Sequence, residues 1–292
     1  MRSKSDIRTY ARCLEIDLIG FTDTQPLEEN ARTFQAWLDS GCAGDMDWMK
    51  SGHRQRFAPS ALLQGAKTVI SIGMSYFCEA SPTNGISRYA WGKDYHLVLK
   101  EKLVVLSRYL KETDPQLRTC ICVDAFPIAE KPIAQKAGLG WQGKHTLLIN
   151  EACGSWIFLG ELIIDREYPP DEPAHDKCGP CRACIDACPT GALLEDRTID
   201  AGKCLSYLTI EYHGEKRHNL RGTVFGCDIC QEACPWNTNP RPSRAEAFFL
   251  PNPLAQLPLE RLLQLSKDNF LARRKNTVFE RIGYERFKRN LS

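Results

Sequence analysis

The chain has 292 residues, with 38 Lys and Arg against 36 Asp and Glu, and 43% of its residues are hydrophobic. This composition excludes an intrinsically disordered chain and is typical of a globular protein that buries a core. The formal net charge of +2 is too small to indicate a nucleic-acid partner, so any such surface must be local. Because no apolar stretch approaches the ~20 residues that cross a bilayer and the N-terminal segment lacks the apolar core of a signal peptide, we expect a cytoplasmic protein without a membrane partner.

The first 170 residues alternate between helical and extended patterns. Residues 5–16 begin with Ser-Asp and predict a helix, and residues 96–112 predict a second helix. The buried stripe of the second helix is expected to contain Leu99, Leu103, Leu106 and Leu110. Strands are predicted over residues 68–77, 118–123 and 156–164. Residues 150–155 predict a turn between antiparallel strands, which favours an α+β fold.

Fourteen cysteines in a reducing compartment indicate metal ligation or redox chemistry rather than a disulfide framework. Six are scattered through the first part of the chain and are interpreted as small buried apolar residues without a further role: Cys13, Cys42, Cys78, Cys120, Cys122 and Cys153. The other eight follow residues 168–176, a stretch rich in proline and acid that neither a helix nor a central strand accommodates. We therefore expect a first domain over residues 1–170, a cysteine-rich domain over 171–240, and a basic helical segment over 241–292 that packs on the core.

The eight cysteines form two sets with the spacing of iron–sulfur ligands. Cys178, Cys181, Cys184 and Cys188 follow the run C-x2-C-x2-C-x3-C-P of bacterial ferredoxins, whose fourth thiolate binds the other cluster. The second set is Cys204, Cys227, Cys230 and Cys234. This crossover assigns one [4Fe-4S] cluster to Cys178, Cys181, Cys184 and Cys234, and a second to Cys188, Cys204, Cys227 and Cys230. A pair of zinc sites is the alternative, although zinc ribbons use well-separated cysteine pairs.

Several longer stretches resemble the epoxyqueuosine reductase family, and the resemblance covers nearly the whole chain. They are RYAWGKDYH (88–96), VDAFPIAEKPIAQKAGLGWQGKHTLLI (123–149), GSWIFLGEL (154–162), CGPCRACIDACPTGAL (178–193), CLSYLTIEY (204–212) and FGCDICQEACPWN (225–237). The resemblance implies an N-terminal α/β domain, similar to that of reductive dehalogenases, that binds base-off cobalamin against a ferredoxin-like domain with two clusters. Its reaction reduces epoxyqueuosine to queuosine at the wobble position of tRNAs with GUN anticodons. We expect a monomer that receives electrons from a low-potential donor such as a flavodoxin or ferredoxin.

The resemblance also assigns the proton donor to Asp124. A carboxyl group that faces the corrin and is shielded from water would have a raised pKa and stay protonated near neutrality. From the residues alone, an Asp at a strand end three positions before Pro127 indicates a turn or a cap.

Other site residues follow from the same resemblance. Asp94, Tyr95 and His96 match a family motif and are expected beside the substrate or the corrin, whereas an isolated His before a helix is usually a cap or a solvated residue. Arg56 and Lys144 are expected to contact the amides or phosphate of cobalamin. Ser206 is expected where the cluster domain meets the corrin.

The glycines Gly138, Gly140 and Gly143 show the spacing G-x-G-x-x-G. They precede a strand-like segment instead of opening a helix, so the pattern does not indicate dinucleotide binding. They are interpreted as a tight turn or as a close approach of the backbone to the corrin.

Basic residues are concentrated in residues 267–292, which contain eight Lys or Arg and three acidic residues. Arg273, Arg274 and Lys275 are the candidates for contacts with the tRNA backbone, and a solvated helix of mixed charge is the alternative. Many family members continue into a helical repeat domain, whereas this sequence ends at Ser292, which bears on tRNA affinity more than on chemistry.

Two other functions remain open on the sequence. One is a cobalamin-dependent reductase of another small substrate, similar to the dehalogenases. The other is a two-cluster electron carrier, which would bind no corrin.

Overall fold

The computed structural model describes residues 1–51, 53–79, 84–124, 127–249 and 252–292. Its strands are β1 (Leu18–Asp23), β2 (Thr68–Ser75), β3 (Thr119–Cys122), β4 (Trp141–Gln142), β5 (Leu148–Ile149) and β6 (Ile157–Ile164). Its helices up to β6 are α1 (Lys4–Cys13), α2 (Glu28–Asp39), α3 (His53–Arg56), α4 (Tyr95–Lys111) and α5 (Glu130–Lys136). The later helices are α6 (Ala183–Ala187), α7 (Leu205–Ile210), α8 (Ile229–Glu232), α9 (Leu259–Leu263), α10 (Lys267–Arg273) and α11 (Tyr284–Leu291). Short 3-10 turns include η1 (Asp47–Lys50) and η7 (Val278–Arg281).

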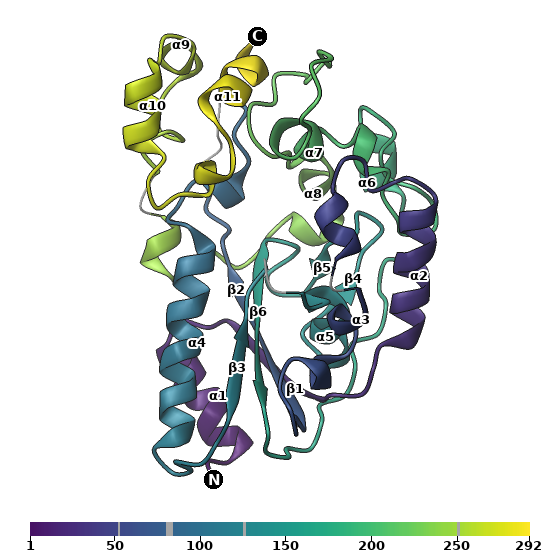
Figure 1. Ribbon diagram of the computed structural model, residues 1–292, viewed down its shortest axis with the longest axis vertical. Helices are drawn as coiled ribbons and strands as arrows, with labels where there is room; N and C mark the ends of the chain where they lie inside the picture. The colour runs from purple at the N-terminus through teal and green to yellow at the C-terminus, as the bar shows by residue number, and fades with distance from the viewer. Residues whose placement is uncertain (52, 80–83, 125–126, 250–251) are drawn as a thin grey trace.

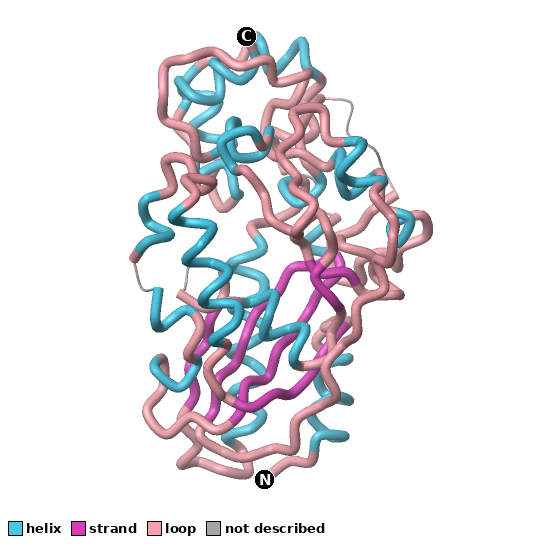
Figure 2. The backbone as a smooth tube through the Cα atoms, turned by 90° about the vertical axis from the view of Figure 1, so that its right-hand side faces the viewer, coloured by secondary structure: helices cyan, strands magenta, loops and turns pink. Residues whose placement is uncertain are grey.

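A four-stranded sheet with the order β1-β2-β6-β3 forms the centre of the N-terminal part, and each neighbouring pair is antiparallel. Helices α1 and α4 cover one face and α5 packs on the other, so the sheet is buried on both sides (Figure 1). Figure 2 shows the strands gathered in the half of the molecule that contains the N-terminus, while the C-terminal half consists of short helices and loops. The predicted α+β fold is confirmed.

Helix α4 forms where the leucine spacing predicts it, and all four predicted leucines are buried. Asp94 is its N-cap, since the Asp94 carboxylate accepts a hydrogen bond from the backbone N–H of His96. The stripe packs on β6, and the missing side chain of Gly160 allows Leu99 and Leu103 to approach that strand closely. Strand β6 is thereby placed beside the N-terminal end of α4.

The turn at residues 150–155 is present, closed by an antiparallel bridge between Asn150 and Gly154. The strands on its two sides do not pair with each other as predicted. Strand β5 pairs with β4, whereas β6 lies between β2 and β3 in the main sheet. A turn signal is local, and the choice of strand partner depends on which apolar faces meet.

The C-terminal segment shares a core with earlier parts of the chain. Phe270, Phe279 and Phe287 are buried in one apolar cluster with Ile86 and Phe225. The last helices therefore lie against the segments that precede α4 and α8, and the positions of the domain boundaries stay a prediction.

The six scattered cysteines are only partly buried. Cys122 and Cys153 are buried, but Cys13 is exposed, so the interpretation of all six as buried residues is wrong. Cys13 lies on the side of α1 opposite the buried Ile7 and Ala11, where a small apolar side chain faces water.

Candidate active site at the end of strand β3

Asp124 lies two residues beyond the end of β3, with a positive φ of 42°. Asp is among the few residues other than glycine that tolerate this left-handed conformation. The backbone N–H of Asp124 donates a hydrogen bond of 2.7 Å to Oε1 of Glu130, the first residue of α5. This bond ties the turn that carries Asp124 to a helix of the main domain.

Two side chains from the start of α4, Tyr95 and His96, contact the Asp124 carboxylate. Nε2 of His96 lies 2.8 Å from Oδ2 of Asp124, and the hydroxyl of Tyr95 donates to the same oxygen. On its other side, Nδ1 of His96 lies 2.7 Å from Oδ1 of Asp94. The ring of Tyr95 stacks on Phe158 of β6 at 4.2 Å, which holds the hydroxyl in place. His96 therefore bridges two carboxylates.

These contacts determine where the proton resides. Burial by itself would raise the pKa of Asp124, but the hydrogen bonds from His96 and Tyr95 and the charges of His96 and Arg281 lower it below its usual value. Burial would lower the pKa of His96, but hydrogen bonds to Asp124 and Asp94 and their charges raise it to about 9. The expectation that Asp124 stays protonated is thus wrong for this structure, because its proton is held by His96.

Two acids close to the Asp124 turn or to its neighbour Glu130 were not recognised in the sequence, the partly buried Glu130 and the fully buried Glu161. Burial and the negative charge of Asp124 raise the pKa of Glu130 to about 8. Glu161, on β6, is fully buried opposite Cys122 and Ser71, and burial and the neighbouring Glu130 raise its pKa well above the usual value. Both acids therefore carry a proton near neutral pH. Glu130 and Lys131 belong to the quoted stretch VDAFPIAEK, so a buried charged pair right after the strand was the available signal.

Beside this acidic group lie polar hydrogens that have no acceptor within the described residues. They belong to Nε of Arg56 and Nε2 of His145, both buried. The ammonium group of Lys131 lies within electrostatic reach of Glu130 and Asp124. Nδ1 of His145 accepts the backbone N–H of Leu147, and burial and the charge of Lys131 lower the His145 pKa to about 4, so the ring is neutral with its proton on Nε2. Buried donors of this kind suit amide and phosphate oxygens of a large cofactor. The predicted position of Arg56 near the site agrees with its interaction with Asp124 and Glu130.

Two other predicted cofactor contacts lie at the cysteine loops. Nζ of Lys144 donates to the carbonyl oxygens of Gly179 and Cys181, at 2.9 and 2.8 Å. These two bonds occupy two of the three N–H groups of the Lys144 ammonium and tie it to the loop of Cys178 and Cys181, and the predicted contact with cobalamin stays a prediction. The backbone N–H of Ser206 faces the thiol of Cys204.

The eight clustered thiols interact electrostatically within two groups. Cys234 interacts with Cys178, Cys181 and Cys184. Cys230 interacts with Cys188, Cys204 and Cys227, and also with Cys184 of the other group. The two groups adjoin each other, because Cys230 also interacts with Cys184, and the assignment of each thiolate to one cluster stays a prediction. Burial raises the pKa of Cys227 to about 11, so ligation there releases a proton.

The glycine motif serves backbone packing. A Cβ on Gly140 would lie 2.0 Å from the carbonyl oxygen of Ile149, and Gly138 has a φ of +80°. The residues after Gly140 enter β4 rather than a helix, in agreement with the rejection of a dinucleotide site.

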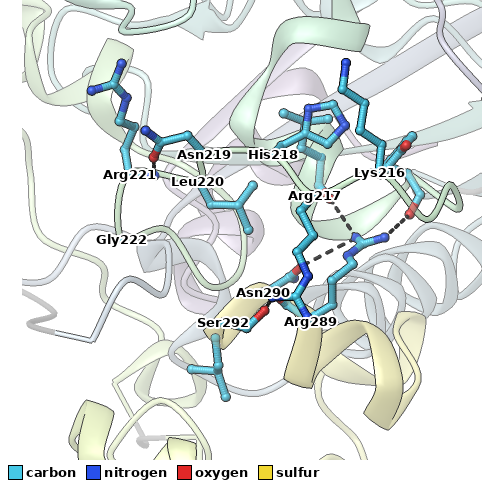
Figure 3. A pocket seen from close by; sticks show the side chains of 13 residues that line it. Lys216, Arg217, His218, Asn219, Leu220, Arg221, Gly222, Arg289, Asn290 and Ser292 are labelled. Atoms are coloured by element: carbon cyan, nitrogen blue, oxygen red, sulfur yellow. Dashed lines mark hydrogen bonds between the residues drawn. The ribbon is translucent and has the colours of Figure 1, made fainter.

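The basic C-terminal residues divide into exposed and structural ones. Arg273 and Lys275 are exposed, whereas Arg274 donates to the carbonyl oxygen of Ile282 at 2.8 Å. A cavity of about 290 Å³ lies between α11 and the loop after α7 (Figure 3). Its basic lining residues are Lys216, Arg217, His218, Arg221 and Arg289. Arg289 donates to the carbonyl oxygens of Leu208, Tyr212 and Gly214, so it braces the loop.

Arg281, from the same basic segment, is placed at the active site. Its Nε donates to Oε1 of Glu211 at 2.7 Å, and it lies within electrostatic reach of Asp124 and Tyr95. Nothing in the spacing of the basic residues distinguishes it from its neighbours.

Comparison with known proteins identifies the family. Residues 56–125 match the family model described as epoxyqueuosine reductase QueG, DUF1730, and residues 177–237 match the 4Fe-4S double cluster binding domain. The epoxyqueuosine reductase of Vibrio cholerae is 38% identical over 98% of this chain and 81% of its own length. The chain belongs to the epoxyqueuosine reductase family. The epoxyqueuosine reductase of Escherichia coli is 40% identical to this chain, over 98% of this chain and 79% of its own length. That of Cyclobacterium marinum is 39% identical and is covered over 94% of its length.

Solved structures of epoxyqueuosine reductases share the fold. One with an epoxyqueuosine-modified tRNA-Tyr stem loop has a TM-score of 0.88 at 30% identity, over 99% of this chain and 79% of that one. Another structure, from Bacillus subtilis, has a TM-score of 0.86 at 29% identity, over 99% of this chain and 79% of that one. In that structure the catalytic aspartate loop is swung out of the active site. A catabolic reductive dehalogenase has a TM-score of 0.50 at 16% identity, over 83% of this chain and 32% of its own, which shows a related fold alone.

Family membership confirms the predicted class of enzyme, an oxidoreductase of tRNA modification, and the double-cluster model confirms the two expected [4Fe-4S] clusters. Cobalamin, the other expected cofactor, stays a prediction. The match of residues 177–237 to a double-cluster model excludes the zinc alternative for these cysteines. A similarity that extends over 98% of the chain likewise excludes an electron carrier with an unrelated appendage. No helix in the described parts of the chain is long and apolar enough to span a membrane.

Proposed function

We propose that this chain reduces epoxyqueuosine to queuosine at the wobble position of tRNAs with GUN anticodons, with Asp124 as the proton donor to the epoxide oxygen. The observation that carries the proposal is the chain Asp94–His96–Asp124 at the end of β3, within a member of the epoxyqueuosine reductase family. Opening the epoxide and removing its oxygen as water consumes two electrons and two protons. Side chains can deliver the protons but cannot supply electrons of the required potential.

The proton reaches the substrate through His96 and Asp124. The imidazolium of His96 holds a proton on Nε2, 2.8 Å from Oδ2 of Asp124, and Asp94 stabilises the positive charge. As negative charge develops on the epoxide oxygen, Asp124 passes on the proton that it receives from His96. Tyr95 keeps its own proton, because burial and the charge of Asp124 raise its pKa well above the usual value. Tyr95 therefore orients Asp124 rather than donating a proton.

Cobalamin, when bound in its reduced form, would supply the electrons. The donors of Arg56 and His145 would hold its amide and phosphate oxygens, since they have no acceptor among the described residues. Glu130 holds the Asp124 turn in the conformation that presents the carboxylate. A relative with the corresponding loop swung out supports a turn that has to be held in place.

The clusters would carry electrons from a low-potential flavodoxin or ferredoxin to the corrin. Cys178, Cys181, Cys184 and Cys234 would bind one cluster, and Cys188, Cys204, Cys227 and Cys230 the other. The electrostatic interaction of Cys184 with Cys230 supports electron transfer between the two clusters. Arg273 and Lys275 would meet the tRNA backbone, as exposed cations do. The enzyme would act as a monomer in the cytoplasm, where its tRNA substrate is found.

The test is nucleoside mass spectrometry of epoxyqueuosine tRNA after anaerobic incubation with reconstituted protein, cobalamin and a strong reductant. We expect the loss of one oxygen with the wild-type chain. Asp124→Asn should keep both clusters and bind cobalamin but react at least about 100-fold more slowly, the usual contribution of a positioned acid. Unchanged nucleoside with the intact wild-type holoenzyme would refute the substrate, and an active Asp124→Asn variant would remove Asp124 from the mechanism.

A further inference from the structure

Trp48 is a large exposed aromatic side chain in η1. Its side chain is 46% exposed, whereas Trp141 and Trp156 are each 2% exposed. Exposed indole rings are costly in water and are frequent at binding surfaces, where the ring offers a flat apolar face. The surroundings of Trp48 indicate what binds there.

The segment that carries Trp48 is held firmly against the cluster domain. The backbone N–H of Asp45 donates to the hydroxyl of Tyr207, on α7, at 2.7 Å. Gly44 has a φ of +58°, and a Cβ there would lie 2.6 Å from the Tyr207 ring. The close approach requires glycine at this position. The backbone just before Trp48 is therefore held in place by contacts with Tyr207.

Arg281 lies over the Trp48 ring. Its guanidinium carbon is 5.7 Å from the ring centroid, a distance at which a cation is attracted by an aromatic face. The bond from Nε to Glu211 fixes the guanidinium plane, and within the described part of the chain Arg281 forms no other hydrogen bond. The side chain is 43% exposed, so its remaining N–H groups are open to a ligand.

The pair stands at the edge of the active site, because Arg281 lies within electrostatic reach of Asp124 and Tyr95. A wobble base that reacts at Asp124 brings its two neighbouring nucleotides close to this edge. Unpaired RNA bases stack on aromatic rings and guanidinium planes, and the charge of an Arg also favours the adjoining phosphate. Trp48 and Arg281 offer both features in one place.

We propose that Trp48 and Arg281 form a stacking platform for the nucleobase next to the modified base in the anticodon loop. The inference rests on the proposed function and deepens it, since it names a second nucleotide that the enzyme contacts. The platform binds the RNA without touching the reacting atoms. It therefore acts on KM more than on kcat.

The test combines Trp48→Ala with epoxyqueuosine stem loops in which the nucleotide immediately 5′ or 3′ of the wobble position is abasic. Trp48→Ala should raise KM for the normal stem loop about tenfold and leave kcat within about twofold, since one stacked base contributes about that much. One of the two abasic substrates should raise KM about equally for the wild type. The same abasic substrate should have no further effect on Trp48→Ala, because the contact is already lost.

Tyr109→Ala is the matched control. Tyr109 also carries an Arg over its ring, with the guanidinium carbon of Arg2 at 4.3 Å, but it lies at the far end of α4 from Asp124. Its KM should stay at the wild-type value. If Trp48→Ala and each of the two abasic substitutions raised KM additively, the platform would be refuted. It would also be refuted if the lower rate of Trp48→Ala depended on the concentration of the electron donor instead of the RNA. Wild-type turnover of the normal stem loop is measured first, so failure of the proposed function is recognised separately.

Discussion

Replacement of Asp94 by Asn tests the proton path at the carboxylate that lies on the other side of His96 from Asp124. Asp94 caps α4 through the His96 backbone N–H at 2.9 Å and contacts Nδ1 of His96 at 2.7 Å. Asn is as good an N-cap as Asp, and its side-chain oxygen can accept both hydrogen bonds. Asp94→Asn therefore removes one negative charge and keeps the local structure.

The magnitude follows from the pKa of His96. Two carboxylates, helped by their hydrogen bonds, raise it from 6.5 to about 9 against the effect of burial. Because the His96 side chain is 31% exposed and water screens the pair, we assign to the charge of Asp94 about one pKa unit, or ~1.4 kcal/mol. A raised pKa keeps His96 protonated below about 9, so the proton and the activity are lost as pH rises through that value. In Asp94→Asn this loss should occur near pH ~8.

The assay is the pH dependence of kcat for epoxyqueuosine tRNA under saturating reductant. Wild type and Asp94→Asn should be equal below pH ~7, and at pH ~8.5 the variant should be about threefold slower. An alkaline limb that stays near that of the wild type would refute the role of Asp94. If Asp94→Asn lowered kcat by the same factor at every pH, a structural defect would be indicated. Thermal unfolding of the holoenzyme would reveal such a defect.

Two further predictions concern the Asp124 turn and the clusters. Glu130→Ala removes the acceptor of the Asp124 N–H and should lower kcat about tenfold, the effect of ~1.4 kcal/mol at one part-buried hydrogen bond. Glu130→Gln keeps an acceptor oxygen and should keep kcat near the wild-type value. Equal kcat values for the two variants would contradict the role of this hydrogen bond in holding the Asp124 turn. Cys230→Ser should lose one of two clusters, so that iron falls from about eight to about four atoms per chain, while Cys153→Ser should leave the iron unchanged. Loss of all iron in a folded Cys230→Ser protein would argue against two separate ligand sets.

Much of the N-terminal fold was predictable, because the helices and long strands carry their own periodicity. The leucine spacing defines α4 and its buried face, and the β-branched run defines β2. Strand pairing was not predictable in the same way. Strand β5 pairs with β4 rather than with β6, because the partner of a strand is chosen by contacts between faces and not by the turn beside it.

The candidate site was predictable where a family motif carried it. Asp94, Tyr95 and His96 were expected beside the substrate or the corrin, and the structure links them to Asp124, the expected proton donor. The prediction that Asp124 is protonated is wrong, since the pKa of Asp124 depends on a histidine that is distant in sequence. Lys144 was assigned to the corrin but meets the cysteine loop, because a lone lysine in a sequence does not reveal which oxygens surround it.

The sequence by itself determined the cluster chemistry, since the spacing of thiolates along a short segment already limits which metal centre they can bind. It also determined the family, through motifs that span nearly the whole chain. Only the tertiary structure decided which groups surround Asp124. Glu130 follows it closely in the chain, but Arg281 comes from a basic segment near the C-terminus, and its charge acts on Asp124 because the fold brings them together. Burial and proximity set pKa values and binding surfaces, and neither can be read from the order of residues.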